Sequence, residues 1–170
     1  MTYQQLIRAR FSARKFADRP VEPEKLERIL EAGRLAPTAK DLQPLRIYLL
    51  QSEEARQKAK EVTQCTFDAP VILMICGLPG EAWINPFTGH NGADIDVAIA
   101  TTHMMLAATD EGLGSTWVGW FDTERAKAIF SLPEGVEPRA MLPLGYIADD
   151  CKPAPKHEIR KPLDTLVTEL

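Results

Sequence analysis

The alternation of apolar and polar positions divides the first half of the chain into helices and a strand. Apolar residues recur at helical spacing after a potential N-cap at Thr2, and again after Pro23, which suits the first turn of a helix. Residues 46–50 are rich in β-branched and aromatic side chains and predict a strand. The polar stretch 52–64 predicts a third helix that faces mostly solvent.

The second half contains the most apolar segments. Residues 71–76 form a continuous apolar run, which is typical of a strand covered on both faces. The helix predicted over 94–110 is apolar or small nearly all round, so we expect it to be shared with a partner subunit. The remaining predicted elements are strands at 115–118 and 139–146 and a short helix at 123–130. This order of elements predicts an α/β or α+β fold.

Length and charge exclude several classes of protein. With 170 residues, 45% of them hydrophobic, the chain suits one domain spanning residues 1–170. The net charge of −4, without long basic runs, argues against nucleic acid or an anionic membrane as a partner. No apolar stretch reaches the roughly 20 residues that cross a bilayer, so we expect a cytoplasmic protein. The cysteines are widely spaced and indicate neither disulfides nor a zinc site.

Candidate chemistry begins after the first helix, where Arg10 and Arg14 bracket Ser12. At helical spacing the two guanidinium groups would point the same way near a helix end. A phosphate monoester carries about −1.5 to −2 charges at neutral pH and suits such donors. Taken alone, R-x-S-x-R also fits a solvated basic patch. An anion site here therefore requires residues from elsewhere in the chain.

A metal site is the alternative at the centre of the sequence. His90, Asp94, Asp96 and His103 are ligand types, and Asp96 and His103 are seven residues apart on one predicted helical face. A helix N-cap carboxylate with a histidine packed in the core or an interface explains them as well and is the favoured interpretation. Cys76 is disfavoured as a nucleophile because an apolar strand opposes thiolate formation.

Several motifs in their order and spacing resemble the nitroreductase family over essentially the whole chain. They are R-x-S-x-R-x-F at 10–16, A-P-T-A-K-D-L-Q-P at 36–44, D-A-P at 68–70, G-L-G-S at 112–115, W-V-G-W-F-D at 117–122, L-G-Y at 144–146 and R-K-P-L at 160–163. The resemblance implies an α+β fold with a central, mostly antiparallel sheet flanked by helices, in an intertwined homodimer that binds FMN between its subunits. It also implies NAD(P)H-linked, ping-pong reduction of small oxidised organic molecules of the nitroaromatic or quinone type.

The resemblance also assigns roles to individual residues, with the chemistry carried by FMN and no metal. Arg10, Ser12 and Arg14 would hold the FMN phosphate and the pyrimidine edge of the ring, and Arg160 would reach the phosphate. Thr38, Ala39 and Gln43 would line the flavin, and Val118, Gly119 and Trp120 would bring backbone N–H groups to its N5 region. Asp41 and Leu45 stand where the family usually has Asn and Trp. Asp41 can accept a hydrogen bond from the flavin N3–H, but near N1 or O2 it would lower the reduction potential.

Two other classes of function remain open from the sequence: a flavin-binding sensor or carrier without turnover, and a binder of phosphorylated metabolites without flavin. The loop 77–92 is long and suits a lid or an interface segment. The aromatic residues Trp83, Phe87, Trp117 and Trp120 fit both core packing and stacking beside a flavin.

Overall fold

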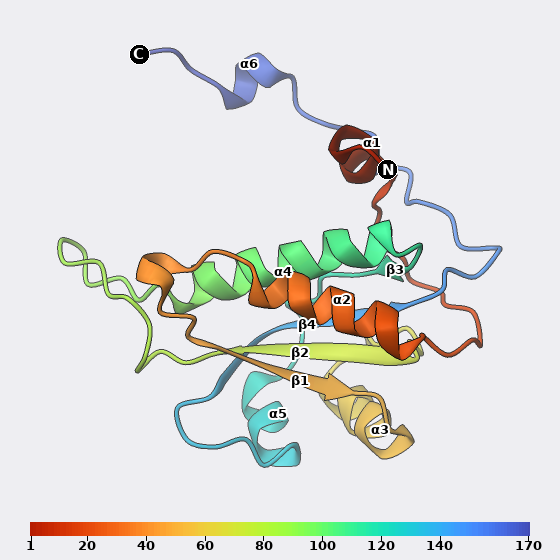
Figure 1. Ribbon diagram of the computed structural model, residues 1–170, viewed down its shortest axis with the longest axis horizontal. Helices are drawn as coiled ribbons and strands as arrows, with labels where there is room; N and C mark the ends of the chain where they lie inside the picture. The colour runs from red at the N-terminus through yellow and green to blue at the C-terminus, as the bar shows by residue number, and fades with distance from the viewer.

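A four-stranded antiparallel sheet separates two helical layers in the computed structural model, which describes residues 1–170 (Figure 1). The strands are β1 (Leu45–Leu50), β2 (Val71–Gly77), β3 (Gly114–Ser115) and β4 (Glu137–Gly145), in the order β1-β2-β4-β3. The helices α2 (Pro23–Arg34) and α4 (Ala93–Asp110) cover one face, and α3 (Glu53–Val62) and α5 (Thr123–Ile129) cover the other. The α+β fold with an antiparallel sheet is confirmed.

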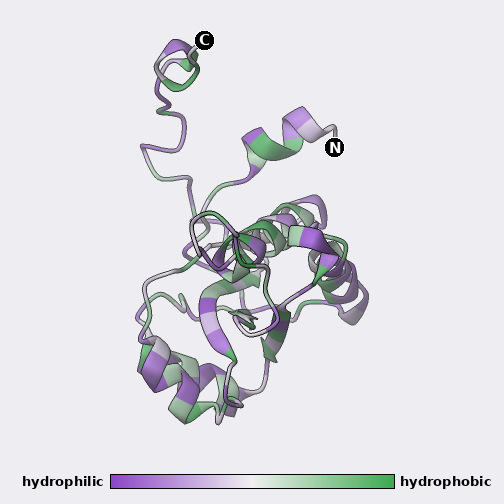
Figure 2. Cartoon of the chain, turned by 90° about the vertical axis from the view of Figure 1, so that its left-hand side faces the viewer, coloured by the Kyte–Doolittle hydropathy of each residue, from purple (hydrophilic) through white to green (hydrophobic).

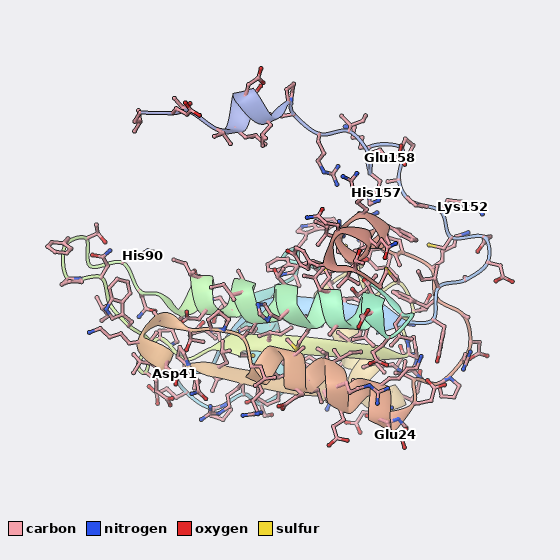
Figure 3. The ribbon with its side chains drawn as sticks, turned by 45° about the horizontal axis from the view of Figure 1, so that its top comes forward. Glu24, Asp41, His90, Lys152, His157 and Glu158 are labelled. Atoms are coloured by element: carbon pink, nitrogen blue, oxygen red, sulfur yellow. The ribbon has the colours of Figure 1, made fainter.

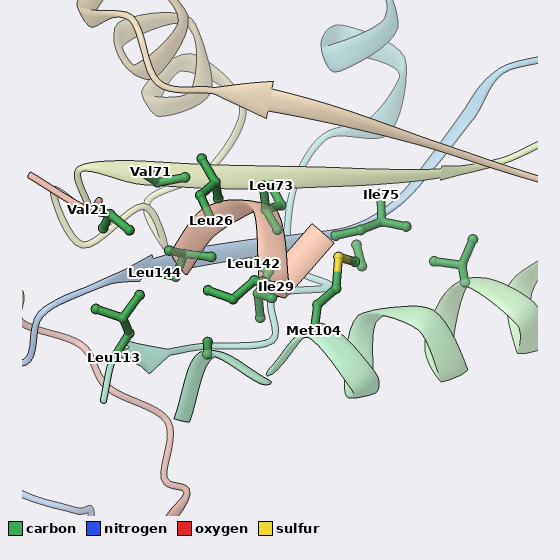
Figure 4. Packing of buried hydrophobic residues seen from close by; sticks show 13 residues of the cluster. Val21, Leu26, Ile29, Val71, Leu73, Ile75, Met104, Leu113, Leu142 and Leu144 are labelled. Carbon is green, nitrogen blue, oxygen red and sulfur yellow. The ribbon is translucent and has the colours of Figure 1, made fainter. Parts of the chain in front are cut away.

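The central strand β2 is buried along its whole length, as its continuous apolar sequence predicts. Successive side chains of a strand point to opposite faces, so Leu73 and Ile75 pack toward α2 and α4 while Ile72 and Met74 pack toward α3 and α5. Figure 4 shows the first of these two cores, with Met104 of α4 close to Ile75. The sheet therefore has no solvent-facing side at its centre.

Helix α4 is buried on one side only within this chain. Its inner side packs on the sheet and on α2, where a Cβ atom on Gly33 would lie 2.7 Å from the Met104 sulfur, so only glycine allows this approach. Its outer side leaves Ile95 53% exposed. No helix in the structure is both long enough and apolar enough to cross a membrane.

The two ends of the chain stand apart from the packed body (Figure 2). Helix α1 (Tyr3–Ala9) and the short helix α6 (Leu163–Leu166) contain no buried residue. Thr2 caps α1 as predicted, and it forms a capping box with Gln5.

One expectation about element bounds is wrong. The strand predicted over 115–118 is reduced to Gly114–Ser115, because beyond it only Val118 pairs again, in an isolated bridge to Met141. Helix α3 faces mostly solvent, as its polar sequence predicts, and only Ala59 and Val62 on one side are buried, in the second core.

Candidate functional site

The stretch from Arg10 to Arg14 is extended, not helical. Helix α1 ends at Ala9, and Ser12 pairs in parallel with Ser115 next to β3. In extended backbone every second side chain lies on the same side, which places Arg10, Ser12 and Arg14 together. The expectation that helical spacing would align the two arginines was therefore wrong, because tertiary pairing with Ser115 sets the local backbone.

A cavity of about 220 Å³ joins this stretch to the C-terminal segment. It is lined by Arg10, Phe11, Ser12, Arg14, Ala154, Lys156, His157 and Arg160. Four of these side chains are cationic and none is a carboxylate, so the cavity suits an anion. Burial, and then repulsion by the nearby Arg160, lower the pKa of Arg10, as expected where cationic groups are brought close together.

His157 fastens the C-terminal segment to the start of the chain. Its ring packs edge to face on Phe11, with centroids 6.1 Å apart, and its Nε2 lies 3.3 Å from the carbonyl oxygen of Arg8. An ion pair between Lys15 and Asp150 ties the same two segments. Lys156 and His157 could not be identified from the sequence, since no motif or spacing connects them to residues 10–14.

Residues 118–120, after β3, contain two backbone N–H groups without a hydrogen-bond acceptor in the chain. The N–H of Val118 donates to the carbonyl of Met141 at 2.8 Å, so this group has a partner within the chain. The N–H groups of Gly119 and Trp120 make no hydrogen bond within the chain. Trp120 is 73% exposed, and its carbonyl accepts a hydrogen bond from the Thr63 hydroxyl at 2.6 Å.

The loop before β1 forms a compact turn around the short 3₁₀ helix η1 (Ala39–Asp41). The Gln43 N–H donates to the Thr38 hydroxyl oxygen and its side-chain amide donates to the Asp41 carboxylate, each at 3.0 Å. Lys40, Asp41 and Gln43 all have positive φ angles, between 52° and 55°. Thr38, Ala39, Asp41 and Gln43 thus form one local unit.

This unit lies far from the cationic cavity in the same chain. Ala39 contacts Asp96 near the start of α4, whereas the N-terminal amino group lies 3.9 Å from Asp110 at the end of α4. At 1.5 Å per residue those two helix positions are about 21 Å apart. Strands β1 and β3 also lie at opposite edges of the sheet, and Figure 3 shows Asp41 and His157 well apart, with Asp41 at the lower left and His157 above and to the right of the centre. The structure thus brings Arg10, Ser12, Arg14 and Arg160 together, but not with the loop.

The sequence pattern of the Nitroreductase family matches residues 7–71 and 63–146. The chain belongs to the nitroreductase family. A crystal structure of a nitroreductase family protein from Clostridium difficile 630 is 38% identical, with a TM-score of 0.93 over 99% of this chain and 98% of that one. The family resemblance found in the sequence is therefore confirmed.

Two relatives carry names that state an activity. One from Methanothermobacter thermautotrophicus, whose name includes NADH dehydrogenase and NAD(P)H nitroreductase, is 32% identical over 88% of this chain and 80% of its own length. One from Bacillus subtilis, named FMN reductase (NAD(P)H), is 29% identical over 85% of this chain and 66% of its own length. Both are similar to this chain over most of its sequence.

The residues that the sequence offers as metal ligands or as a nucleophile do not form a second site in this nitroreductase-family chain. Asp96 is buried and turned inward, and Asp94 forms an ion pair with Arg139 at 2.7 Å. No group of three or more His, Cys, Asp or Glu side chains gathers in a way that could hold a metal ion. Cys76 is fully buried in β2, and burial raises the pKa of its thiol to about 12, so it is not available as a thiolate.

Proposed function

We propose that this chain reduces small oxidised organic compounds, of the nitroaromatic or quinone type, with NAD(P)H by a ping-pong mechanism. Membership of the nitroreductase family makes it an FMN-dependent NAD(P)H oxidoreductase. The observation that supports the proposal most is the cavity that gathers Arg10, Arg14, Lys156 and Arg160 without a carboxylate. When bound, FMN supplies the electron transfer between NAD(P)H and the acceptor.

The cavity fits the phosphate of FMN. A doubly charged phosphate would neutralise part of the charge that Arg10, Arg14, Lys156 and Arg160 bring together, and guanidinium groups offer it several donors at once. Burial and repulsion by Arg160 lower the pKa of Arg10, and an anion in the cavity would offset both effects. Lys156 joins the residues proposed from the sequence.

The ring of FMN requires donors where negative charge develops and a surface to lie on. The N–H groups of Gly119 and Trp120 are free to donate toward the N5 region, while the Val118 N–H is engaged by Met141. Thr38, Ala39, Asp41 and Gln43 would line the ring from the loop before β1. Exposed aromatic side chains such as Trp120 leave space for a substrate to stack.

We further propose that two copies of the chain complete each site as a homodimer, because one copy holds the cavity and the loop too far apart. The cavity would come from one subunit and the loop from its partner. The exposed side of α4 and the C-terminal segment, which runs away from the body in Figure 1, supply the contact surface. Leu163, Leu166, Val167 and Leu170 in that segment are all more than half exposed and have no packing partner in their own chain.

An anaerobic experiment tests the proposed activity. The protein loaded with FMN is mixed with NADH or NADPH, the flavin absorbance is followed, and a quinone or nitroaromatic compound is then added. We expect bleaching by the nicotinamide, recovery with the acceptor, and parallel lines in double-reciprocal plots. Bound FMN that no nicotinamide bleaches would indicate a sensor or carrier, and a protein that binds no FMN would contradict the whole proposal.

A further inference from the structure

Asp96 is a buried carboxylate whose role the proposed activity leaves unexplained. It lies in the first turns of α4 and is 1% exposed. One carboxylate oxygen accepts a hydrogen bond from the Ala39 N–H at 3.0 Å. The other oxygen is buried and has no hydrogen-bond partner. A buried, half-satisfied carboxylate is costly, so its presence indicates a specific task.

The loop that contacts Asp96 needs external support. Three of its residues, Lys40, Asp41 and Gln43, adopt left-handed backbone conformations without being glycine. Such conformations persist only where the surroundings impose them. Within residues 38–43 the other hydrogen bonds are local, such as those from Gln43 to Thr38 and Asp41. The bond to Asp96 is the only one that ties this loop to a residue distant in the sequence.

A carboxylate at this position suits the task. Its negative charge makes it a stronger acceptor for a backbone N–H than a neutral oxygen. The partial positive charge at the start of α4 favours an anion in the first turns of the helix. Ala39 also lies beside the start of α4, since a Cβ atom on Gly92 would lie 3.9 Å from the Ala39 Cβ, an ordinary van der Waals distance.

We propose that Asp96 is a positioning residue that holds the loop 38–43 in the shape that receives the flavin ring. The proposal rests on the proposed function, since the loop lines the ring only if FMN binds. Asp96 acts through Ala39 and does not touch the cofactor. It therefore controls the affinity for the ring and not the affinity for the phosphate.

Flavin titrations of the intact protein test this assignment. Asp96→Ala removes the acceptor and should weaken the binding of FMN and riboflavin alike by about tenfold, since the partly buried Ala39 N–H loses its partner. Asp96→Asn keeps an amide oxygen as acceptor and should restore binding to within about threefold of wild type. Thr101→Val is the matched control, because Thr101 is equally buried in α4 but its hydroxyl donates only within the helix, to Val97.

The N–H side of the same hydrogen bond provides a second variant. Ala39→Pro removes the donor, and Thr38 before it already has the extended backbone that a following proline requires. If the bond carries the effect, Asp96→Ala and Ala39→Pro should not add in the double variant. In the flavin-free protein, amide exchange at Ala39 measured by NMR should also be faster in Asp96→Ala than in wild type.

The outcomes separate this assignment from the proposed function. Wild type that binds neither flavin would overturn both. Wild type that binds FMN while a folded Asp96→Ala binds both flavins unchanged, with unchanged exchange at Ala39, would overturn the role of Asp96 alone. Equal losses of flavin affinity in Thr101→Val and Asp96→Ala would also overturn it, because they would indicate general damage to α4. Additive effects of Asp96→Ala and Ala39→Pro would overturn it as well, because they would indicate that the two changes damage α4 and the loop separately.

Discussion

His157 packs edge to face on Phe11, with the ring planes inclined at 68° and the centroids 6.1 Å apart. The contact joins a residue near the C-terminus to the stretch that follows α1. It closes one wall of the cationic cavity and places Lys156 and Arg160 beside Arg10. The phosphate half of the proposed site therefore depends on an aromatic contact between the two ends of the chain.

Loss of this contact should weaken FMN binding. In His157→Ala the C-terminal segment loses its anchor, and an aromatic pair worth about 0.5–1.5 kcal/mol corresponds to a loss of roughly two- to tenfold in affinity. Riboflavin, which lacks the phosphate, should bind as in wild type. Glu158→Ala, a change at the next residue, which does not line the cavity, serves as the control in fluorescence titrations. An unchanged FMN affinity in His157→Ala would show that the segment stays in place without this contact.

The two arginines of the first stretch should differ in what they recognise. Charged hydrogen bonds to phosphate are worth roughly 1.5–3 kcal/mol, so Arg14→Ala should weaken FMN by about ten- to a hundredfold. If Arg14 binds the phosphate, the affinity for riboflavin should change little. If it contacts the pyrimidine edge, the affinities for FMN and riboflavin should fall together. Titrations of Arg10→Ala and Arg14→Ala with both flavins assign the roles. Wild-type FMN affinity in both variants would show that residues 10–14 form a solvated basic patch and not an FMN site.

Asp41 should lower the reduction potential of the bound flavin. Its side chain is exposed in the loop, and one carboxylate oxygen already accepts a hydrogen bond from the Gln43 amide at 3.0 Å. Asp41→Asn keeps an oxygen for that bond and removes the charge, so the FMN potential should rise. Spectroelectrochemical titration measures the shift. A potential that is unchanged or lower would mean that Asp41 faces away from the ring.

The stability of the fold should depend on pH through Glu22. The Tyr146 hydroxyl donates to its carboxylate at 2.7 Å and is the main cause that lowers the pKa of Glu22 from 4.5 to about 2. Because the folded value is the lower one, this stabilisation is present above about pH 4.5 and is lost as the pH falls toward 2. The difference in urea midpoint between wild type and Tyr146→Phe should therefore shrink from pH 6 to pH 3.

Tyr48→Phe is the control for this effect, because the Tyr48 hydroxyl makes no hydrogen bond within the chain and Tyr48 is likewise half-buried. The difference in urea midpoint between Tyr48→Phe and wild type should not change with pH. If the difference in urea midpoint between wild type and Tyr146→Phe is the same at both pH values, the Tyr146 hydroxyl does not stabilise the ionised carboxylate of Glu22.

The sequence predicts those features of the fold that depend on local pattern. The apolar run of β2 identifies that strand and its burial, and the small and apolar residues of α4 identify the helix, without any tertiary information, whereas burial of the outer side of α4 in a dimer remains a prediction. The extended backbone at Arg10 was missed because it comes from pairing with Ser115, which is distant in sequence. The family motifs name Arg10, Ser12, Arg14 and Arg160, and the structure gathers these four, although their contacts with FMN remain predictions.

Other residues of the candidate site cannot be identified from a sequence pattern. Lys156 and His157 belong to a segment without periodicity, and the contacts of His157 with Phe11 and with the Arg8 carbonyl hold this segment at the cavity. The sequence presents Asp96 as a candidate metal ligand or a carboxylate at a helix N-cap, and its hydrogen bond to Ala39 appears only when α4 and the loop are packed together.

The central claim is that the cavity of one subunit and the loop of its partner form one FMN site, and mixed dimers test it most directly. One chain carries Arg10→Ala with Arg14→Ala, the other carries Thr38→Ala with Gln43→Ala, and two different affinity tags isolate the mixed dimer after co-expression. Each variant alone should bind FMN weakly. In the mixed dimer, the intact cavity of the second chain meets the intact loop of the first, so titration should find one tight FMN site per dimer. A mixed dimer with no tight site would contradict the claim, because it would mean that each chain needs its own cavity and its own loop.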